Sequence, residues 1–247
     1  MVLAKNTEYL LVLDVDGVLI DSGGSFENCV AMTLKEMVPE LEWSNELFWK
    51  FKQIPGFNND FRLTAAAIAL FETGEIDLLD DTNNTGFPHM EGRIKELAPL
   101  CGERLQFFYQ SYKHLESPLI TWPELEAIHG WNIAILTGRL PEELLMGFEV
   151  LGFELPAVCD SCPEFCKPEP GGLIHLANIY SANKIYFVGD TRDDATCLSR
   201  ARNARPDLDF TFVAVNKLRN EIAQPGDLAF ATLRDFLASG ELDFPKP

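Results

Sequence analysis

The sequence predicts an α/β fold, a doubly wound parallel sheet with an all-helical segment inserted after its first strand. Two observations support this prediction: continuous apolar runs recur along the chain, and helical segments separate most of them. Strands that are covered on both faces are apolar throughout, whereas strands with one face in water alternate apolar and polar residues. Apolar strands that alternate with helices are typical of a parallel sheet wrapped by helices.

The apolar runs place the expected strands at residues 9–13, 131–137, 184–190 and 210–215, with a shorter and weaker strand at 157–159. The intervening helices are expected at residues 141–151, 171–180 and 194–203, and a closing helix is expected after residue 230. Because helical crossovers join these strands, they are expected to run parallel in one sheet.

Residues 25–115 break this alternation, since they contain helical patterns and no comparable strand. Helices are expected near residues 26–37, 45–51, 60–72 and 103–114, separated by polar loops. The chain is therefore expected to form an α/β core from residues 1–21 and 116–247, with a helical domain at 22–115.

The chain of 247 residues carries 38 acidic and 20 basic residues, a formal net charge of -18. Such a negative field disfavours nucleic acid and anionic membranes as partners, because both need clustered Lys and Arg. The apolar run at residues 9–13 is too short to span a membrane, and no secretion signal accompanies it. We expect a cytoplasmic protein, monomeric or homodimeric, without a nucleic-acid or membrane partner.

Polar residues follow the expected strands, where the carboxyl ends of parallel strands form the usual ligand-binding edge. They are Asp14, Asp16, Thr137, Lys167, Asp190 and Asp194. Carboxylates gathered at one edge repel one another unless a cation is present, and a set of oxygen ligands favours Mg²⁺. The sequence therefore predicts a magnesium site at this edge.

Four segments, DVDGVL at 14–19, TGR at 137–139, KP at 167–168 and GDTRDD at 189–194, resemble in order the four motifs of the haloacid dehalogenase superfamily. The helical insert falls where the cap of subfamily I belongs. The resemblance is greatest to the branch of phosphoglycolate phosphatase and beta-phosphoglucomutase. It implies a Rossmann-like core with a cap inserted after the first strand.

This resemblance implies a Mg²⁺-dependent phosphatase that acts on a small phosphorylated metabolite, such as phosphoglycolate or a sugar phosphate. Asp14 would attack phosphorus and carry an aspartyl-phosphate, while Asp16 would act as general acid and then general base. Thr137 would bind the phosphoryl oxygens, and Lys167 would offset their charge. The implied metal ligands are Asp14, the backbone carbonyl of Asp16, Asp190, and either Asp194 or Asp193.

Other functions remain open at this point. Phosphoglucomutase-type transfer needs the same residues, and a catalytically silent protein could keep the fold to bind a metabolite or a partner. Gly138, through its backbone amide, and Arg139 are candidates for phosphate binding, although Arg139 could equally pair with one of the carboxylates.

In the helical insert, residues 56–62 form a polar loop that is a candidate for substrate recognition, through Asn58, Asn59 and Arg62. The alternative is that Asn59 or Asp60 only caps the following helix. Phosphonate-cleaving relatives use a cap lysine as a Schiff base, but nothing in the sequence marks a lysine of the insert as buried.

Cys159, Cys162 and Cys166 have spacings that permit a zinc or iron–sulfur site, with His175 or Cys197 as a fourth ligand. A reduced loop that positions Lys167 is the simpler interpretation. The four histidines, including His129, show no spacing typical of a metal site.

Overall fold

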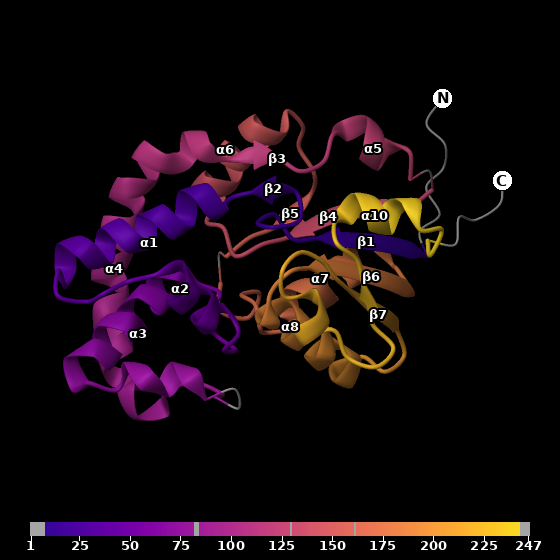
Figure 1. Cartoon of the computed structure of the whole chain (residues 1–247). Helices are drawn as coiled ribbons and strands as arrows, with labels where there is room; N and C mark the ends of the chain where they lie inside the picture. Colours follow the sequence, from indigo (N-terminus) through magenta and orange to yellow (C-terminus); the bar gives the residue numbers. More distant parts are fainter. Residues whose placement is uncertain (1–7, 82–83, 129, 161, 243–247) are drawn as a thin grey trace. The chain divides into compact units, whose positions relative to one another are not determined.

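The computed structural model describes residues 8–81, 84–128, 130–160 and 162–242 (Figure 1). His129, for which no role was expected, and the ends of the chain lie outside these residues. Two compact units are present: residues up to Asp21 with those from Ser117 onward, and Ser22–Glu116. Glu116 belongs to the second unit, where its carboxylate accepts hydrogen bonds of 2.9 Å from both Ser25 Oγ and Tyr109 Oη.

The first unit contains a six-stranded parallel sheet in the order β5-β4-β1-β6-β7-β8. Its strands are β1 Tyr9–Leu13, β4 Asn132–Leu136, β5 Ala157–Val158, β6 Lys184–Gly189, β7 Asp209–Ala214 and β8 Leu228–Ala229. In the central strand, Leu13 pairs with Ile135 on one side and with Val188 on the other. This register brings the ends of β1, β4 and β6 to the same edge, and the predicted α/β fold is confirmed.

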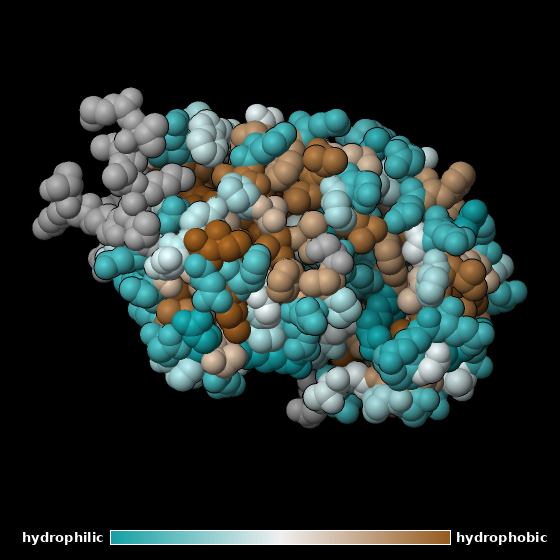
Figure 2. Space-filling model, turned by 180° about the vertical axis from the view of Figure 1, so that it is seen from behind, coloured by the Kyte–Doolittle hydropathy of each residue, from teal (hydrophilic) through white to brown (hydrophobic). Residues whose placement is uncertain are grey.

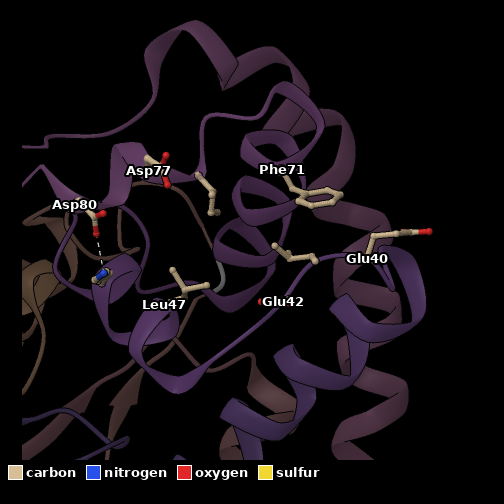
Figure 3. Close-up of a pocket in the computed structure, with 9 residues that line it drawn as sticks. Glu40, Glu42, Leu47, Phe71, Asp77 and Asp80 are labelled. Atoms are coloured by element: carbon tan, nitrogen blue, oxygen red, sulfur yellow. Dashed lines mark hydrogen bonds and ion pairs between the residues drawn. The ribbon is translucent and has the colours of Figure 1, made fainter.

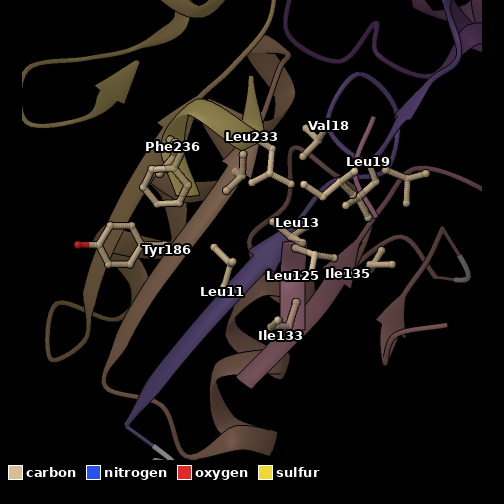
Figure 4. Close-up of a cluster of buried hydrophobic side chains, with 14 of the residues drawn as sticks. Leu11, Leu13, Val18, Leu19, Leu125, Ile133, Ile135, Tyr186, Leu233 and Phe236 are labelled. Carbon is tan, nitrogen blue, oxygen red and sulfur yellow. The ribbon is translucent and has the colours of Figure 1, made fainter. Parts of the chain in front are cut away.

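Helices cover both faces of the sheet, as Figure 1 shows for α7 and α8 on one face and α10 on the other. The helices of this unit are α5 Trp122–Glu126, α6 Pro141–Leu151, α7 Gly171–Tyr180, α8 Arg192–Ala204, α9 Arg219–Ile222 and α10 Leu233–Ala238. Leu11 and Leu13 of β1 pack with Leu233 and Phe236 of α10 in one buried cluster (Figure 4). Leu10 and Val12 point to the opposite face because side chains alternate along a strand, and both are fully buried. Burial on both faces explains why the strand is apolar throughout.

Several short elements of this unit were not expected. β2 Ile20–Asp21 pairs antiparallel with β3 Ser117–Pro118, at the two points where the chain leaves and re-enters the unit. The edge strand β8 and the helices α5 and α9 were missed as well. The missed elements have two to five residues and lack the longer apolar runs that indicated β1 and β4, and pairing in the folded unit fixes the missed strands instead.

The second unit contains the helices α1 Gly23–Met37, α2 Asn45–Lys52, α3 Asp60–Thr73 and α4 Glu91–Tyr112, and the 3₁₀ turns η1 Ile76–Asp80, η2 Pro88–Met90 and η3 Lys113–Leu115. Within the described residues it contains no strand, as expected. Helix α3 is buried from Leu63 to Leu70 and packs against both α1 and α4. Asn59 caps it, accepting a 3.1 Å hydrogen bond from the Arg62 amide at Oδ1.

Helix α4 begins at Glu91, not near residue 103 as predicted, and Pro99 lies inside it. A proline within a helix costs about 3 kcal/mol, because it removes a hydrogen bond and crowds the preceding turn. Burial of Ile94, Leu97 and Cys101 on the same helix offsets this cost. Gly102 also lies within this helix, and it allows the ring of Phe61 to pack closely, since a Cβ there would lie 3.1 Å from that ring. Packing thus accommodates Pro99 and Gly102, two residue types that disfavour a helix interior.

The surface combines apolar and polar residues, which Figure 2 shows in brown and teal on one face. Large exposed apolar side chains include Phe107, Leu145 and Ile179. Apolar atoms make up much of any globular protein surface, so such residues need no special explanation. In the part of the chain that the structure describes, none of the helices combines the length and the apolarity needed to cross a membrane.

Candidate active site

The turn after β1 carries Asp14 and Asp16. Asp14 is buried, and its Oδ1 accepts a 2.8 Å hydrogen bond from the amide of Val15. The chain then turns at Gly17, which has a φ of 73° and donates a 2.8 Å hydrogen bond to the carbonyl of Ile20. A Cβ at residue 17 would lie 2.0 Å from Oδ2 of Asp190. Glycine is therefore required here both by the backbone conformation and by the close approach of a second carboxylate.

Asp190 and Asp194 lie at the junction of β6 and α8. Asp194 Oδ2 accepts hydrogen bonds of 3.0 Å from the amide of Thr191 and 2.7 Å from its hydroxyl, which closes the first turn of α8. The amide of Asp190 donates to the same oxygen at 3.2 Å. Gly189 allows this arrangement, because a Cβ there would lie 2.4 Å from Cβ of Asp194. The carboxylate of Asp194 is thus a structural part of the helix start as well as a member of the site.

Lys167 joins the two turns. Its ammonium lies 2.9 Å from Oδ1 of Asp14 and 2.6 Å from Oδ1 of Asp194, and its side chain is only 3% exposed. Burying an ammonium is costly unless carboxylates pair with it. Both partners are present, so Lys167 fixes the orientation of Asp14 relative to α8.

Burial and mutual repulsion govern the protonation of these groups. Burial raises the pKa of Asp14 from 3.8 to about 7; Lys167 opposes the shift, while Asp194 and Asp16 add to it. Burial, with the charges of Asp194 and Asp14, also raises the pKa of Asp190 well above its ordinary value. Burial by itself would lower the pKa of Lys167, but the two neighbouring carboxylates raise it above its usual value. The cluster therefore has more negative charge than its one lysine can balance.

The donor set fits a divalent cation. Ligand oxygens of Asp14, Asp190 and Asp194 lie within 4.8 Å of one another, and all three residues are buried. With all three ionised, one lysine leaves two negative charges, which a divalent ion would balance. Hard oxygen ligands of this kind suit Mg²⁺ or Ca²⁺. The carboxylate of Asp193, the alternative to Asp194, is buried but is not one of these three, and a role for the carbonyl of Asp16 stays a prediction.

Thr137 and Gly138 follow β4 at the same edge of the sheet. Thr137 is buried, its amide donates to the carbonyl of Val158 at 3.0 Å, and its Oγ1 accepts a 3.2 Å hydrogen bond from the amide of Arg139. Gly138 is exposed, and a Cβ there would contact nothing within 4 Å. The backbone at Gly138 is thus accessible to a ligand. The Arg139 side chain turns to Asp16, with Nη2 at 2.7 Å from Oδ1.

A family model described as haloacid dehalogenase-like hydrolase matches residues 10–202, most of the chain. The chain belongs to this family. The predicted superfamily is therefore confirmed, and so is the prediction that the protein is a hydrolase. A comparison with curated proteins gives no significant match.

Solved structures with the same fold include members of this hydrolase family. Phosphatase Tt82 from Thermococcus thioreducens has a TM-score of 0.65 and 21% identity, over 94% of this chain and 98% of its own. A hydrolase from Pseudomonas syringae has a TM-score of 0.68 and 17% identity, over 94% and 97%. A predicted phosphoglycolate phosphatase from Haemophilus somnus has a TM-score of 0.63 and 17% identity, over 95% and 99%. At these identities the similarity establishes the fold of this hydrolase.

Asn216, which follows β7 in this hydrolase, is a residue of the site that was not predicted from the sequence. Its Nδ2 lies 3.4 Å from both Oδ2 of Asp190 and the carbonyl of Gly17. Asn216 has a φ of 66°, a conformation that asparagine adopts more readily than most residues. The signal was available, because this asparagine directly follows the last apolar strand and so lies at the same sheet edge. It orients one of the three clustered carboxylates.

The candidate residues of the helical unit have partners within that unit. Asn59 caps α3, and Arg62 forms a two-pronged ion pair with Glu91 at 2.9 and 2.6 Å. Asn58 accepts hydrogen bonds from Lys52 through its carbonyl, at 2.6 Å, and its side chain, at 3.3 Å. The capping alternative for Asn59 is thus observed. A role of Asn58, Asn59 and Arg62 in substrate binding stays a prediction.

Lys52 is buried, which nothing in the sequence had indicated. Its ammonium lies 2.8 Å from Oδ1 of Asp60 and 5.1 Å from the centre of the Phe48 ring. These contacts, together with those to Asn58, tie the end of α2 to the start of α3. Lys52 is therefore a structural element of the helical unit.

The thiols of the loop at 159–166 are free, and the described cysteines do not form a metal-binding group with His175 or with one another. Cys166 donates to the carbonyl of Cys162 at 2.9 Å and to the carboxylate of Asp160. Burial, with the hydrogen bond and charge of Asp160, raises the pKa of Cys166 to about 12. The thiol of Cys166 is therefore protonated at neutral pH, in agreement with a reduced loop next to Lys167.

A cavity of about 310 Å³ lies in the helical unit (Figure 3). Its lining combines apolar residues such as Leu47 and Phe71 with acidic residues such as Glu40 and Asp77. Lys50 also lines it and is paired with Asp80 at 2.7 Å. Among the described residues that line it, none belongs to the predicted site. An acidic lining does not suit a phosphate anion, so the cavity is not part of the candidate active site.

Proposed function

We propose that this hydrolase is a Mg²⁺-dependent phosphatase of small phosphorylated metabolites. The observation that supports it is the buried Asp14, held by Lys167 and grouped with Asp190 and Asp194 at the end of the parallel sheet. A phosphate monoester resists attack by an anion, because both reactants are negatively charged. A lysine and a divalent cation beside the attacking carboxylate remove this barrier.

Asp14 is the proposed nucleophile. Its carboxylate oxygen forms a bond to phosphorus as the bond between phosphorus and the leaving oxygen breaks, which gives an aspartyl-phosphate. Asp16, two residues along the same turn, donates its proton to the leaving oxygen. In the second half of the reaction Asp16 takes a proton from water as the water oxygen bonds to phosphorus and the bond between phosphorus and Asp14 breaks, which releases phosphate and the free Asp14 carboxylate.

The phosphoryl oxygens are bound by the end of β4 and by Lys167. Thr137 supplies its hydroxyl, and the amide of the exposed Gly138 is the second proposed donor. Lys167 balances charge on the transferring group while holding Asp14 in place. Donors fixed before the substrate arrives lower the reorganisation cost of the reaction.

Asp14, Asp190 and Asp194 are the proposed side-chain ligands of Mg²⁺, with the backbone carbonyl of Asp16. When bound, the ion supplies positive charge that offsets the charge of the phosphoryl group. Asp14 remains ionised in its presence, because a cation opposes the effect of burial on its pKa.

The substrate is proposed to be phosphoglycolate or a sugar phosphate. The supporting comparison is with the predicted phosphoglycolate phosphatase from Haemophilus somnus, which shares the fold over 95% of this chain. The net charge of -18 also favours a small substrate that is captured locally over a large polyanion.

The test is the release of inorganic phosphate from 4-nitrophenyl phosphate, with Mg²⁺ and with EDTA, by wild type and by Asp14→Asn. We expect turnover only with Mg²⁺, and a loss of at least about 10³-fold in Asp14→Asn. Asp207→Asn is the matched control, because Asp207 lies in the same unit and pairs with Arg205 on the surface. Full activity of Asp14→Asn would reject Asp14 as the nucleophile.

A panel of metabolites then identifies the substrate class. Phosphoglycolate and several sugar phosphates should release phosphate at rates that differ among them. Isomerisation of a sugar phosphate without phosphate release would show transfer to a sugar hydroxyl instead of water. No reaction with any substrate, with or without metal, would reject the proposed phosphatase.

A further inference from the structure

Arg139 is a buried arginine whose guanidinium group contacts the side chain of Asp16 and the backbone of Glu143. Nη2 lies 2.7 Å from Oδ1 of Asp16, and Nε lies 3.1 Å from its Oδ2. On the other side, Nη1 donates to the carbonyl of Glu143 at 3.3 Å. The side chain of Arg139 is 1% exposed, and that of Asp16 is 33% exposed. The arginine is therefore the fixed member of the pair, and the carboxylate is the member that a substrate can reach.

The surroundings of Arg139 are built to hold it. Its amide donates to Oγ1 of Thr137 at 3.2 Å, which fixes the turn after β4. The next amide, of Leu140, donates to the carboxylate of Glu143 at 2.9 Å, which fixes the start of α6. Gly147 on α6 provides space, since a Cβ there would lie only 3.1 Å from Nη1 of Arg139. The guanidinium thus has little freedom to turn toward another ligand.

We propose that Arg139 is a positioning residue that holds the carboxylate of Asp16 in one orientation beside Asp14, and that it does not bind the phosphate. This inference rests on the proposed function. A planar guanidinium that contacts both oxygens of a carboxylate fixes its plane and direction, which a lysine cannot do. Asp16 must be correctly placed both to deliver a proton to the leaving oxygen and to take one from the attacking water, and only the first of these steps depends on the leaving group.

The test compares two substrates that differ in their need for this proton. 4-Nitrophenolate leaves readily without one, whereas the alkoxide of an alkyl phosphate such as glycerol phosphate does not. In Arg139→Met we expect kcat/KM for the alkyl phosphate to fall at least about tenfold more than kcat/KM for 4-nitrophenyl phosphate, since general acid catalysis contributes about 10²–10⁴-fold. The ratio kcat/KM reports the steps up to departure of the leaving oxygen, whereas kcat also includes hydrolysis of the aspartyl-phosphate, which is the same for both substrates. The inhibition constant of inorganic phosphate should stay within about threefold of the wild-type value.

Two further variants make the result specific. Arg139→Lys keeps the charge but not the planar fork, so it should show the same selective loss to a smaller degree. Gly147→Ala keeps Arg139 but displaces its guanidinium, and it should also affect the alkyl phosphate more. Arg234→Met is the control, because Arg234 pairs with Glu124 on the surface of the same unit. It should affect neither substrate.

Equal losses of kcat/KM for both substrates would overturn the inference, since they indicate a purely structural role. A clear rise of the inhibition constant of inorganic phosphate would overturn it in favour of phosphate binding by Arg139. Absence of activity in the wild type rejects the proposed function, and crystal structures of wild type and Arg139→Met then test the inference. An Asp16 carboxylate with the same orientation in both would overturn it, and one that turns away or is disordered in the variant would support it.

Discussion

At the scale of single residues, the central feature of the site is the buried carboxylate of Asp14, which loses its proton less readily than a carboxylate in water. The pKa of Asp14 is raised to about 7 by burial, and that of Asp190 is raised as well. The folded protein without metal therefore holds protons that the unfolded chain loses. A cation must displace these protons to bind, so metal binding and protonation compete.

This competition predicts a pH dependence. Between 3.8 and about 7 the folded state binds more protons at Asp14 than the unfolded state, so the stability of the metal-free protein should fall as pH rises through this range. Over the same range the affinity for Mg²⁺ should rise, because the proton on Asp14 that competes with the ion is lost. Thermal unfolding with EDTA and calorimetric titration with Mg²⁺ at several pH values measure the two effects.

Asp207→Asn should keep both trends, because Asp207 is exposed and distant in sequence from the metal ligands. Asp14→Asn should show a weaker dependence of stability on pH. A Mg²⁺ affinity that is constant between pH 5 and 8 would contradict the role assigned to the raised pKa of Asp14.

The residues that carry charge in the site could be predicted from the sequence, because each follows an apolar strand. The partner of Arg139 could not, since Asp16 is far away along the chain and the sequence offers many carboxylates. Nor could the burial of Lys52, which depends on how the ends of two helices meet. Asn216 could have been found by extending the same rule to the last strand.

At the scale of elements, the turn between β1 and β2 is the most constrained part of the site. Gly17 has a positive φ and lies against the carboxylate of Asp190. Gly152, at the end of α6, has the same φ of 73°, but a Cβ there would meet nothing within 4 Å. The two glycines therefore separate the cost of backbone conformation from the cost of crowding.

Gly152→Ala should lower the free energy of unfolding by about 1–2 kcal/mol, the cost of a left-handed conformation for a residue with a Cβ. Gly17→Ala should cost more, because Asp190 must also move. It should in addition weaken Mg²⁺ binding by about tenfold or more, as expected when a ligand is displaced. Urea denaturation and calorimetric titration measure these effects. Equal stabilities of the two variants would show that Asp190 yields without cost.

Strands could be predicted where an apolar run was uninterrupted, whereas the start of a helix could not be predicted where packing determines it. The apolar runs at 9–13 and 184–190 reliably indicated strands, because burial on both faces leaves an uninterrupted signal. Helix α4 was predicted too short, since Pro99 and Gly102 indicate a break when read locally. Their neighbours on the buried face keep the helix continuous, and only the folded unit shows this.

At the scale of the whole molecule, the protein has a formal net charge of -18, although its site is proposed to accept an anion. The field of the protein should slow the approach of a doubly charged phosphate ester, while the buried lysine and the metal act only at short range. Salt screens charges that are further apart than about 10 Å at 0.1 M ionic strength.

We therefore expect kcat/KM for a phosphate monoester to rise about two- to fivefold as NaCl is increased from roughly 10 to 200 mM. Stopped-flow or initial-rate measurements at constant Mg²⁺ test this, and KCl should give the same result because the effect depends on ionic strength. A steady decrease with salt would show that local positive charge dominates the approach.

Asp194 performs two tasks with its two oxygens: one anchors Lys167, and the other closes the start of α8. Natural selection for a folded protein and natural selection for catalysis consequently act on the same carboxylate. A gene copy released from the need for activity would gain nothing by losing this residue, since its product would become less durable. The signature of an active enzyme at this position can thus outlast the activity itself during evolution.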